Sequence, residues 1–201
     1  KVFEQLNIDG TTYRKLIEED GTPLSAAKAR KEQERMDTEI AKRKNESEKD
    51  RQKRQREHQK EIDEAIKFRE EVGRAFDFKL VGEEKVNGFD CWRVSGEPKA
   101  GFKPTTSQGK WLPKVHGTLW IEKQSYEWLR MNVELLDNIR FLGFVASLGK
   151  GTRMEAQQMR VNNELWHPQW ARFNGNVRAL WKSMRGDAET QWQNFRKFQT
   201  E

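Results

Sequence analysis

A run of 20 consecutive residues, Lys42 to Glu61, contains no apolar side chain. A segment this polar cannot bury surface, so it adds nothing to a hydrophobic core by itself. By contrast, 18 of the 21 aromatic residues, including all eight tryptophans, follow Ala75. The sequence therefore predicts that the core and any binding surface come mainly from the part of the chain after Ala75.

The polar run belongs to a charged segment, residues 24–75, whose composition is typical of helix. Ser25 is a good N-cap, and no glycine or proline interrupts most of the residues that follow it. A single helix over this segment would be about 70 Å long, which exceeds the width of a domain of this size. A second capping pattern, Ser47 followed by Asp50, favours two helices, roughly 26–44 and 48–73, over one long rod.

The same segment carries the sharpest basic cluster of a chain whose net charge is +6. Acidic residues are interspersed in it, and such mixed signs usually indicate i,i+4 pairing on an exposed helix. The alternative is a site for an acidic partner or an anionic surface, with Lys49, Arg51, Lys53 and Arg54 as its candidate residues. The charge allows a peripheral membrane contact, and nucleic acid is a less favoured partner.

Before residue 24 and after Ala75, the pattern is that of β-strands and tight turns. Residues 2–8 and 11–17 predict a small hairpin, and beyond Ala75 apolar residues alternate with polar ones. Asn87-Gly88 is a strong hairpin signal, because both residues tolerate a positive φ. We expect a single domain over residues 1–201, with the helical segment, as a hairpin or as one long helix, between the small hairpin and a main sheet.

The best-specified hairpin joins residues 115–121 to residues 126–135. If residues 123–125 form its loop, Leu119 faces Leu129 on one side of the sheet and Trp120 faces Trp128 on the other. Both faces then carry apolar side chains, so we expect both to be covered. A curved sheet that holds something on its concave side would have this pattern.

A short apolar segment follows this hairpin and ends at Gly149-Lys150-Gly151. Its spacing of three and four residues predicts one or two helical turns. Two interpretations stay open: a buried corner of the fold, or a mobile flap over a cavity. The residues concerned are Phe141, Phe144, Val145 and Leu148.

Catalytic and metal-binding motifs are missing from the sequence. Three scattered histidines do not form a ligand set, and neither a nucleophile elbow nor a dinucleotide fingerprint is found. Cys91 is the only cysteine, which excludes an intrachain disulfide and predicts a buried thiol. We therefore expect a protein that is not an enzyme and that needs no cofactor or metal.

Several short motifs together resemble the outer-membrane lipoprotein-sorting proteins of the LolA/LolB-like superfamily, in particular a bacterial branch of the cell envelope. The main one is Gly117-Thr118-Leu119-Trp120-Ile121-Glu122-Lys123, followed by residues 126–134 and a closing antiparallel meander. The others are Asp20-Gly21, Pro23-Leu24-Ser25, Phe76-Asp77-Phe78 and Val161-Asn162-Asn163-Glu164-Leu165-Trp166-His167-Pro168.

The resemblance implies an α+β fold: a curved antiparallel sheet that forms a half-open β-barrel, here with a long charged helical insertion. The concave face of such a barrel, lidded by helices, accepts acyl chains of a lipid or lipoprotein in the periplasm. On this basis we expect a periplasmic carrier or sensor whose signal peptide has been removed. The expected cavity wall is Leu119, Leu129, Met131 and Val133, and the expected flap is residues 141–148; a filled core is the alternative.

Overall fold

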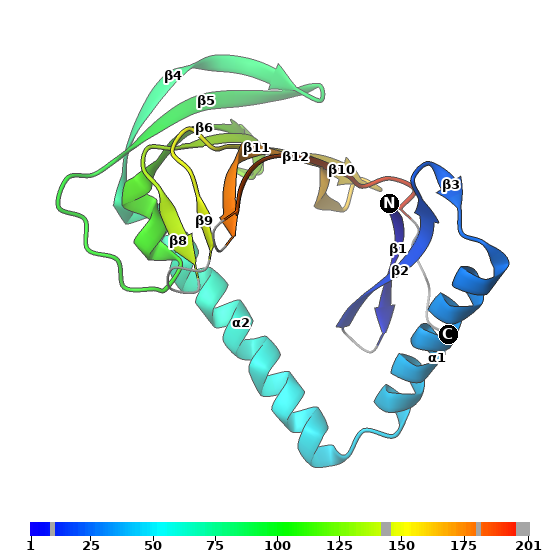
Figure 1. Cartoon of the computed structure of the whole chain (residues 1–201). Coiled ribbons are helices and arrows are strands. Elements are labelled where there is room, and N and C mark those ends of the chain that lie inside the picture. Colours follow the sequence, from blue (N-terminus) through cyan, green and yellow to red (C-terminus); the bar gives the residue numbers. More distant parts are fainter. Residues whose placement is uncertain (9–10, 142–145, 180–181, 196–201) are drawn as a thin grey trace. The chain divides into compact units, whose positions relative to one another are not determined.

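A computed structural model describes residues 1–8, 11–141, 146–179 and 182–195 of the chain. The chain divides into two compact units, Lys1–Asp63 and Glu64–Glu201, whereas the sequence predicts one domain. Each unit combines helix with antiparallel sheet, so the α+β class is confirmed (Figure 1).

The first unit contains a small sheet and most of the helical segment. Strands β1 (Val2–Ile8), β2 (Thr11–Glu19) and β3 (Thr22–Pro23) pair in that order and are antiparallel, which confirms the predicted hairpin. Helix α1 (Ala26–Lys44) begins after Ser25, whose side chain accepts a hydrogen bond from the backbone N of Lys28. It packs on β2, where Lys15 Nζ donates to Gln33 Oε1 at 2.6 Å.

Helix α2 (Glu48–Ala75) follows a short connection, so the prediction of two helices rather than one rod is confirmed. Ser47 Oγ accepts from the backbone N of Asp50 at 3.2 Å, which is the predicted cap. Glu46, in the connection, pairs with Arg54 at 2.8 Å and with Arg43 at 3.6 Å. Neither helix of the described ranges has an apolar stretch long enough to span a bilayer.

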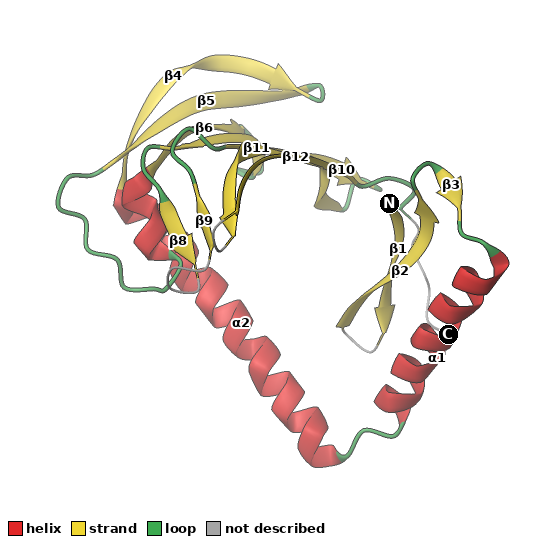
Figure 2. Cartoon of the chain, viewed as in Figure 1, coloured by secondary structure: helices red, strands yellow, loops and turns green. Residues whose placement is uncertain are grey.

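The second unit is built on a sheet of nine strands among its described residues (Figure 2). The sheet runs in the order β4-β5-β6-β7-β10-β11-β9-β8, with β12 on the other edge of β11. Every pairing is antiparallel. The sheet is not closed into a barrel. The strands are β4 (Phe76–Val86), β5 (Phe89–Pro98), β6 (Val115–Glu122), β7 (Trp128–Leu135), β8 (Ile139–Phe141), β9 (Ala146–Leu148), β10 (Arg153–Val161), β11 (Leu165–Ala179) and β12 (Lys182–Gln191). A 3₁₀-helix, η1 (Gly109–Lys114), precedes β6.

Two turns of this sheet have the backbone that their sequences predict. Asn87 and Gly88 have φ of 49° and 84° between β4 and β5. Asn162 and Asn163 have φ of 52° and 56° between β10 and β11. Asparagine and glycine tolerate this left-handed region, so both pairs suit a tight turn, and the hairpin predicted at Asn87-Gly88 is confirmed.

The register predicted for the β6–β7 hairpin is wrong by two residues. Leu119 pairs with Met131, and Trp120 pairs with Arg130 instead of lying across from Trp128. The connection between the strands is five residues long because the buried Glu122 carboxylate accepts bonds from Gln124 N at 2.9 Å and Ser125 N at 2.6 Å. A shift of two residues keeps each side chain on its face, except where a bulge intervenes.

Two clusters of buried apolar residues lie in the second unit. One contains Val86, Cys91, Trp120 and Leu129, with Phe89 and Trp166 packed against it. The Cys91 thiol is fully buried, as expected, and burial raises its pKa. The other cluster contains Ala75, Phe76 and Leu112, with Phe68, Val72, Phe102 and Val115 around it.

Candidate functional site

Two rows of apolar or small residues cross one face of the large sheet. Residues that pair directly across neighbouring strands point to the same face. One row follows Phe78, Gly96, Gly117, Val133, Met154 and Phe173 from β4 to β11. The adjacent row follows Leu80, Val94, Leu119, Met131, Ala156 and Ala171. We call this surface the apolar face.

The described residues leave the apolar face partly open. Phe78 and Leu80 on β4 are 44% and 58% exposed. Further along the rows, Leu119, Met131 and Val133 are half-buried, and neither buried cluster of the described residues includes them. The apolar face is therefore accessible where a sealed core would not be.

One end of the apolar face is covered by the end of α2. Phe76 and Val115 lie on the same face, two residues before Phe78 and Gly117 on their strands, and they pack in a cluster with Phe68 and Val72 of α2 and Leu112 of η1. This covering consists of side chains from the second unit alone. The apolar face thus has a closed end under helix and an open remainder.

A buried carboxylate fixes the loop beside that closed end. Glu71 of α2 is fully buried and accepts hydrogen bonds from the backbone N and hydroxyl of both Thr105 and Thr106. The bond from the Thr106 hydroxyl, with those from Thr105, outweighs the effect of burial and holds the pKa of Glu71 below its usual value. The carboxylate is therefore a structural anchor for the segment that leads into η1.

The opposite face of the sheet carries a polar row beside the buried cluster around Trp120, and we call it the polar face. A row of direct partners there contains Ser95, Thr118, Asn132, Glu155, Arg172 and Glu189. Two ion pairs bridge neighbouring strands, Arg153 to Glu134 and Arg172 to Glu189, each at 2.9 Å. This polar row and its ion pairs contrast with the two apolar rows of the apolar face.

Three of the four residues predicted for the cavity wall lie together on the apolar face, namely Leu119, Met131 and Val133. The fourth, Leu129, does not. A bulge between Trp120 and Ile121 gives β7 one extra residue at this point, and Leu129 packs with Trp120 in the buried cluster. Leu129 is thus part of the core on the other side of the sheet.

The helical prediction for the flap is wrong within the described residues. Phe141 ends β8, and Leu148 lies in β9, where it pairs with Ile139 of β8 and Val177 of β11. Strand pairing on both sides of β9 overrides a helical spacing that spans only eight residues. Phe144 and Val145 lie outside the described residues.

The four predicted partner-binding residues do not form one group on α2. Lys49 and Lys53 are exposed on one side of the helix, together with Arg56 and Lys60, and border a shallow hollow of about 490 Å³. Arg51 falls on the other side by helical periodicity. Arg54 is half-buried and held by Glu46, so it belongs to the connection between the helices.

The residues that β4, β10 and β11 contribute to the apolar face are not among those predicted for the cavity wall. The alternation of apolar residues predicts a strand that contains Phe78 and Leu80. It does not predict that β5 lies between β4 and β6, so it does not place these residues on the same face as Leu119. Met154 and Phe173 alternate with charged residues on β10 and β11, a signal that does indicate a strand with one apolar face.

The function of this chain is indicated neither by a metal site among its described residues nor by a relative. The described ranges hold no group of three His, Cys, Asp or Glu side chains arranged to bind a metal ion. No family model, no curated protein and no solved structure matches the chain.

Proposed function

We propose that this protein is a non-enzymatic periplasmic carrier or sensor that holds an acyl chain of a lipid or lipoprotein against the apolar face. The observation that supports it is the pair of apolar rows that run through β4, β5, β6, β7, β10 and β11 without being sealed. Large exposed apolar surfaces on soluble proteins usually mark a binding site.

The proposal includes a half-open barrel of the LolA/LolB-like kind, with the apolar face as its concave side. Two glycines favour this curvature. A Cβ on Gly96 would come within 3.1 Å of the Phe78 ring, and a Cβ on Gly117 would meet the backbone of β7. Glycine in a strand interior often marks such a close approach or a sharp bend.

An acyl chain fits this surface better than a polar ligand does. The two rows are several residues long and nearly uniform in chemistry, so they offer an apolar track with few hydrogen-bonding groups. The end of α2 covers Phe76 along one side of the track, and Phe78 and Leu80, which follow Phe76 on the same strand, are partly exposed and leave the β4 end of the track accessible.

Uptake of a dansyl-labelled fatty acid by the folded protein tests the proposal. We expect Met131→Glu to weaken uptake about tenfold or more, because a carboxylate would have to be desolvated against the chain. The matched control is Thr118→Glu, which places the same charge on the polar face one strand away. A folded protein that takes up no probe, or equal losses in both variants, would contradict the proposal.

A second candidate function is favoured by the basic side of α2. Lys49, Lys53, Arg56 and Lys60 recur at helical spacing along three turns, an arrangement that suits an acidic partner or an anionic surface. Binding to phosphatidylglycerol vesicles should weaken steeply with salt and fail when Lys49, Lys53 and Arg56 become Glu. Arg51→Glu is the control, and salt-independent binding would remove this candidate.

A further inference from the structure

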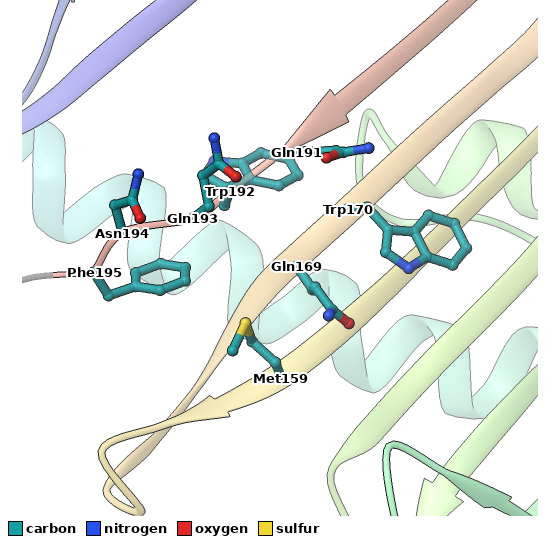
Figure 3. Close-up of a pocket in the computed structure, with 8 residues that line it drawn as sticks. All are labelled: Met159, Gln169, Trp170, Gln191, Trp192, Gln193, Asn194 and Phe195. Carbon is teal, nitrogen blue, oxygen red and sulfur yellow. The ribbon is translucent and has the colours of Figure 1, made fainter.

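A hollow of about 390 Å³ lies where β12 ends, beside β10 and β11 (Figure 3). Four of its eight lining residues are carboxamides: Gln169, Gln191, Gln193 and Asn194. Three more are aromatic, Trp170, Trp192 and Phe195, and the last is Met159. None of the eight carries a formal charge, in a chain where 35% of residues are charged.

The fold places this hollow apart from the apolar face. Trp170 pairs with Gln157, which pairs with Arg130, and this row belongs to the face that carries Trp120. Ala171, the next residue of β11, lies on the apolar face. The two sites therefore use opposite sides of the sheet.

Fixed contacts hold the lining residues in place. The bulge opposite Gln157 inserts Gln169 into β11, and Gln169 Oε1 accepts from Asn87 Nδ2 at 3.0 Å and from Gln157 Nε2 at 2.9 Å. Its remaining hydrogen-bonding group is Nε2, with two donors. The backbone N of Trp192 donates to Gln169 O at 2.8 Å, which ties the end of β12 to the bulge.

The aromatic rings are also positioned by their neighbours. Phe195 lies edge-on to the His167 ring, with 4.5 Å between ring centroids. The Trp170 ring is flanked by the guanidinium carbons of Arg172 at 4.8 Å and Arg130 at 5.9 Å. Trp170, Trp192 and Phe195 are half-buried and line the hollow.

We propose that this hollow binds a neutral carbohydrate. A sugar ring has an apolar face of C–H groups that packs on an indole, and its hydroxyls each donate and accept hydrogen bonds. Carboxamides are the uncharged side chains that likewise offer a donor and an acceptor together. The volume lies near the lower end of the roughly 300–1,000 Å³ of small-molecule sites, which suits a mono- or disaccharide unit.

A proline-rich peptide is the main rival, because aromatic grooves also bind polyproline helices. Its backbone presents carbonyl acceptors without amide donors at the prolines, so it needs donors alone. Gln191, Gln193 and Asn194 each offer an acceptor as well as a donor, and Gln169 adds the two donors of its Nε2. Acceptors among the lining groups match hydroxyls, which donate, better than prolyl carbonyls, which only accept. The proposal is independent of acyl-chain binding and goes beyond it.

An array of neutral glycans tests the proposal on the chain of residues 1–201: cello-, xylo-, manno-, galacto- and chito-oligosaccharides, with a decaproline peptide beside them. We expect at least one glycan class to bind, and we expect Trp192→Ala and Gln193→Ala each to weaken that binding about tenfold. Gln193 is exposed, so its loss leaves the fold intact. Tyr126→Ala and Gln124→Ala, an aromatic and an amide outside the hollow, should bind as the unmodified protein does.

Several results would overturn the proposal. These are binding to no glycan, preference for decaproline, or glycan binding that survives both hollow variants.

Discussion

At the scale of single residues, position relative to the sheet decides what each apolar side chain does. Leu119 and Leu129 are both leucines of the same hairpin, yet Leu119 lies half-buried on the apolar face while Leu129 is fully buried in a core cluster. The bulge in β7 makes the difference. The two should therefore respond differently to truncation.

Leu129→Ala should lower the free energy of unfolding by about 2–5 kcal/mol, since it leaves a cavity among Val86, Cys91 and Trp120. Leu119→Ala should cost clearly less, because its side chain is partly exposed. Denaturant unfolding of both variants measures the difference. Equal losses would mean that Leu119 also lies in a sealed core.

Glu71 makes a pH-dependent contribution to stability. Its pKa is lowered in the folded protein from the ordinary value of 4.5, so its contribution is fully present above that value and is lost as pH falls through the folded pKa. Glu71→Gln should therefore lower Tm at neutral pH, and the gap to the unmodified protein should shrink on acidification.

Thermal unfolding at a series of pH values between about 7 and 3 follows that gap. Glu70→Gln, at the exposed neighbouring carboxylate, serves as the control. A gap for Glu71→Gln that stays constant with pH would show that the charge of Glu71 is not what anchors Thr105 and Thr106.

At the scale of elements, local chemistry predicted the boundaries well. Ser25 and Ser47 cap the two helices, and Asn87-Gly88 and Asn162-Asn163 turn two hairpins, because these residues act on the backbone beside them. The register of the β6–β7 hairpin was harder to predict from the sequence. Glu122 binds its own turn and lengthens the loop, and a buried side chain that organises a loop leaves no periodic signal.

The apolar face shows the same limit. Alternation identified its strands, but only pairing across six strands brings Phe78, Leu119 and Met154 to one surface. The helical prediction for the segment before Gly149 is wrong because eight residues are too few to distinguish the helical spacing from the strand spacing. Pairing with β11 and β8 makes the described part of this segment strand. Long-range pairing is thus what the sequence did not determine.

Two glycines of the second unit should give opposite results when replaced by alanine. At Gly117 the new Cβ would collide with the Asn132 carbonyl of β7, so Gly117→Ala should destabilise the sheet. At Gly73 in α2 nothing lies within 4 Å of the new Cβ, and Gly73→Ala should stabilise by about 0.5–1 kcal/mol. Thermal unfolding compares them, and a neutral Gly117→Ala would argue against a close approach of β6 to β7.

At the scale of the whole molecule, the chain assigns different chemistry to different surfaces. Three surfaces occupy separate parts of the described chain: the apolar face, the polar face and the basic side of α2. The polar face includes the hollow at the end of β12, which we call the amide-rich hollow because four of its lining residues are carboxamides. The proposed role of the apolar face is to hold an acyl chain. Aromatic residues gather after Ala75 because the large sheet is there, and the polar run near residue 50 forms helix that buries almost nothing.

Photo-cross-linking with a diazirine-bearing fatty acid, followed by peptide mapping, shows where an acyl chain lies on the folded protein. We predict adducts on β6, β7 and β10, at Leu119, Met131 and Met154, and their loss in Met131→Glu. Adducts confined to α2 or to the amide-rich hollow, or no adduct on the folded protein, would contradict the proposed role.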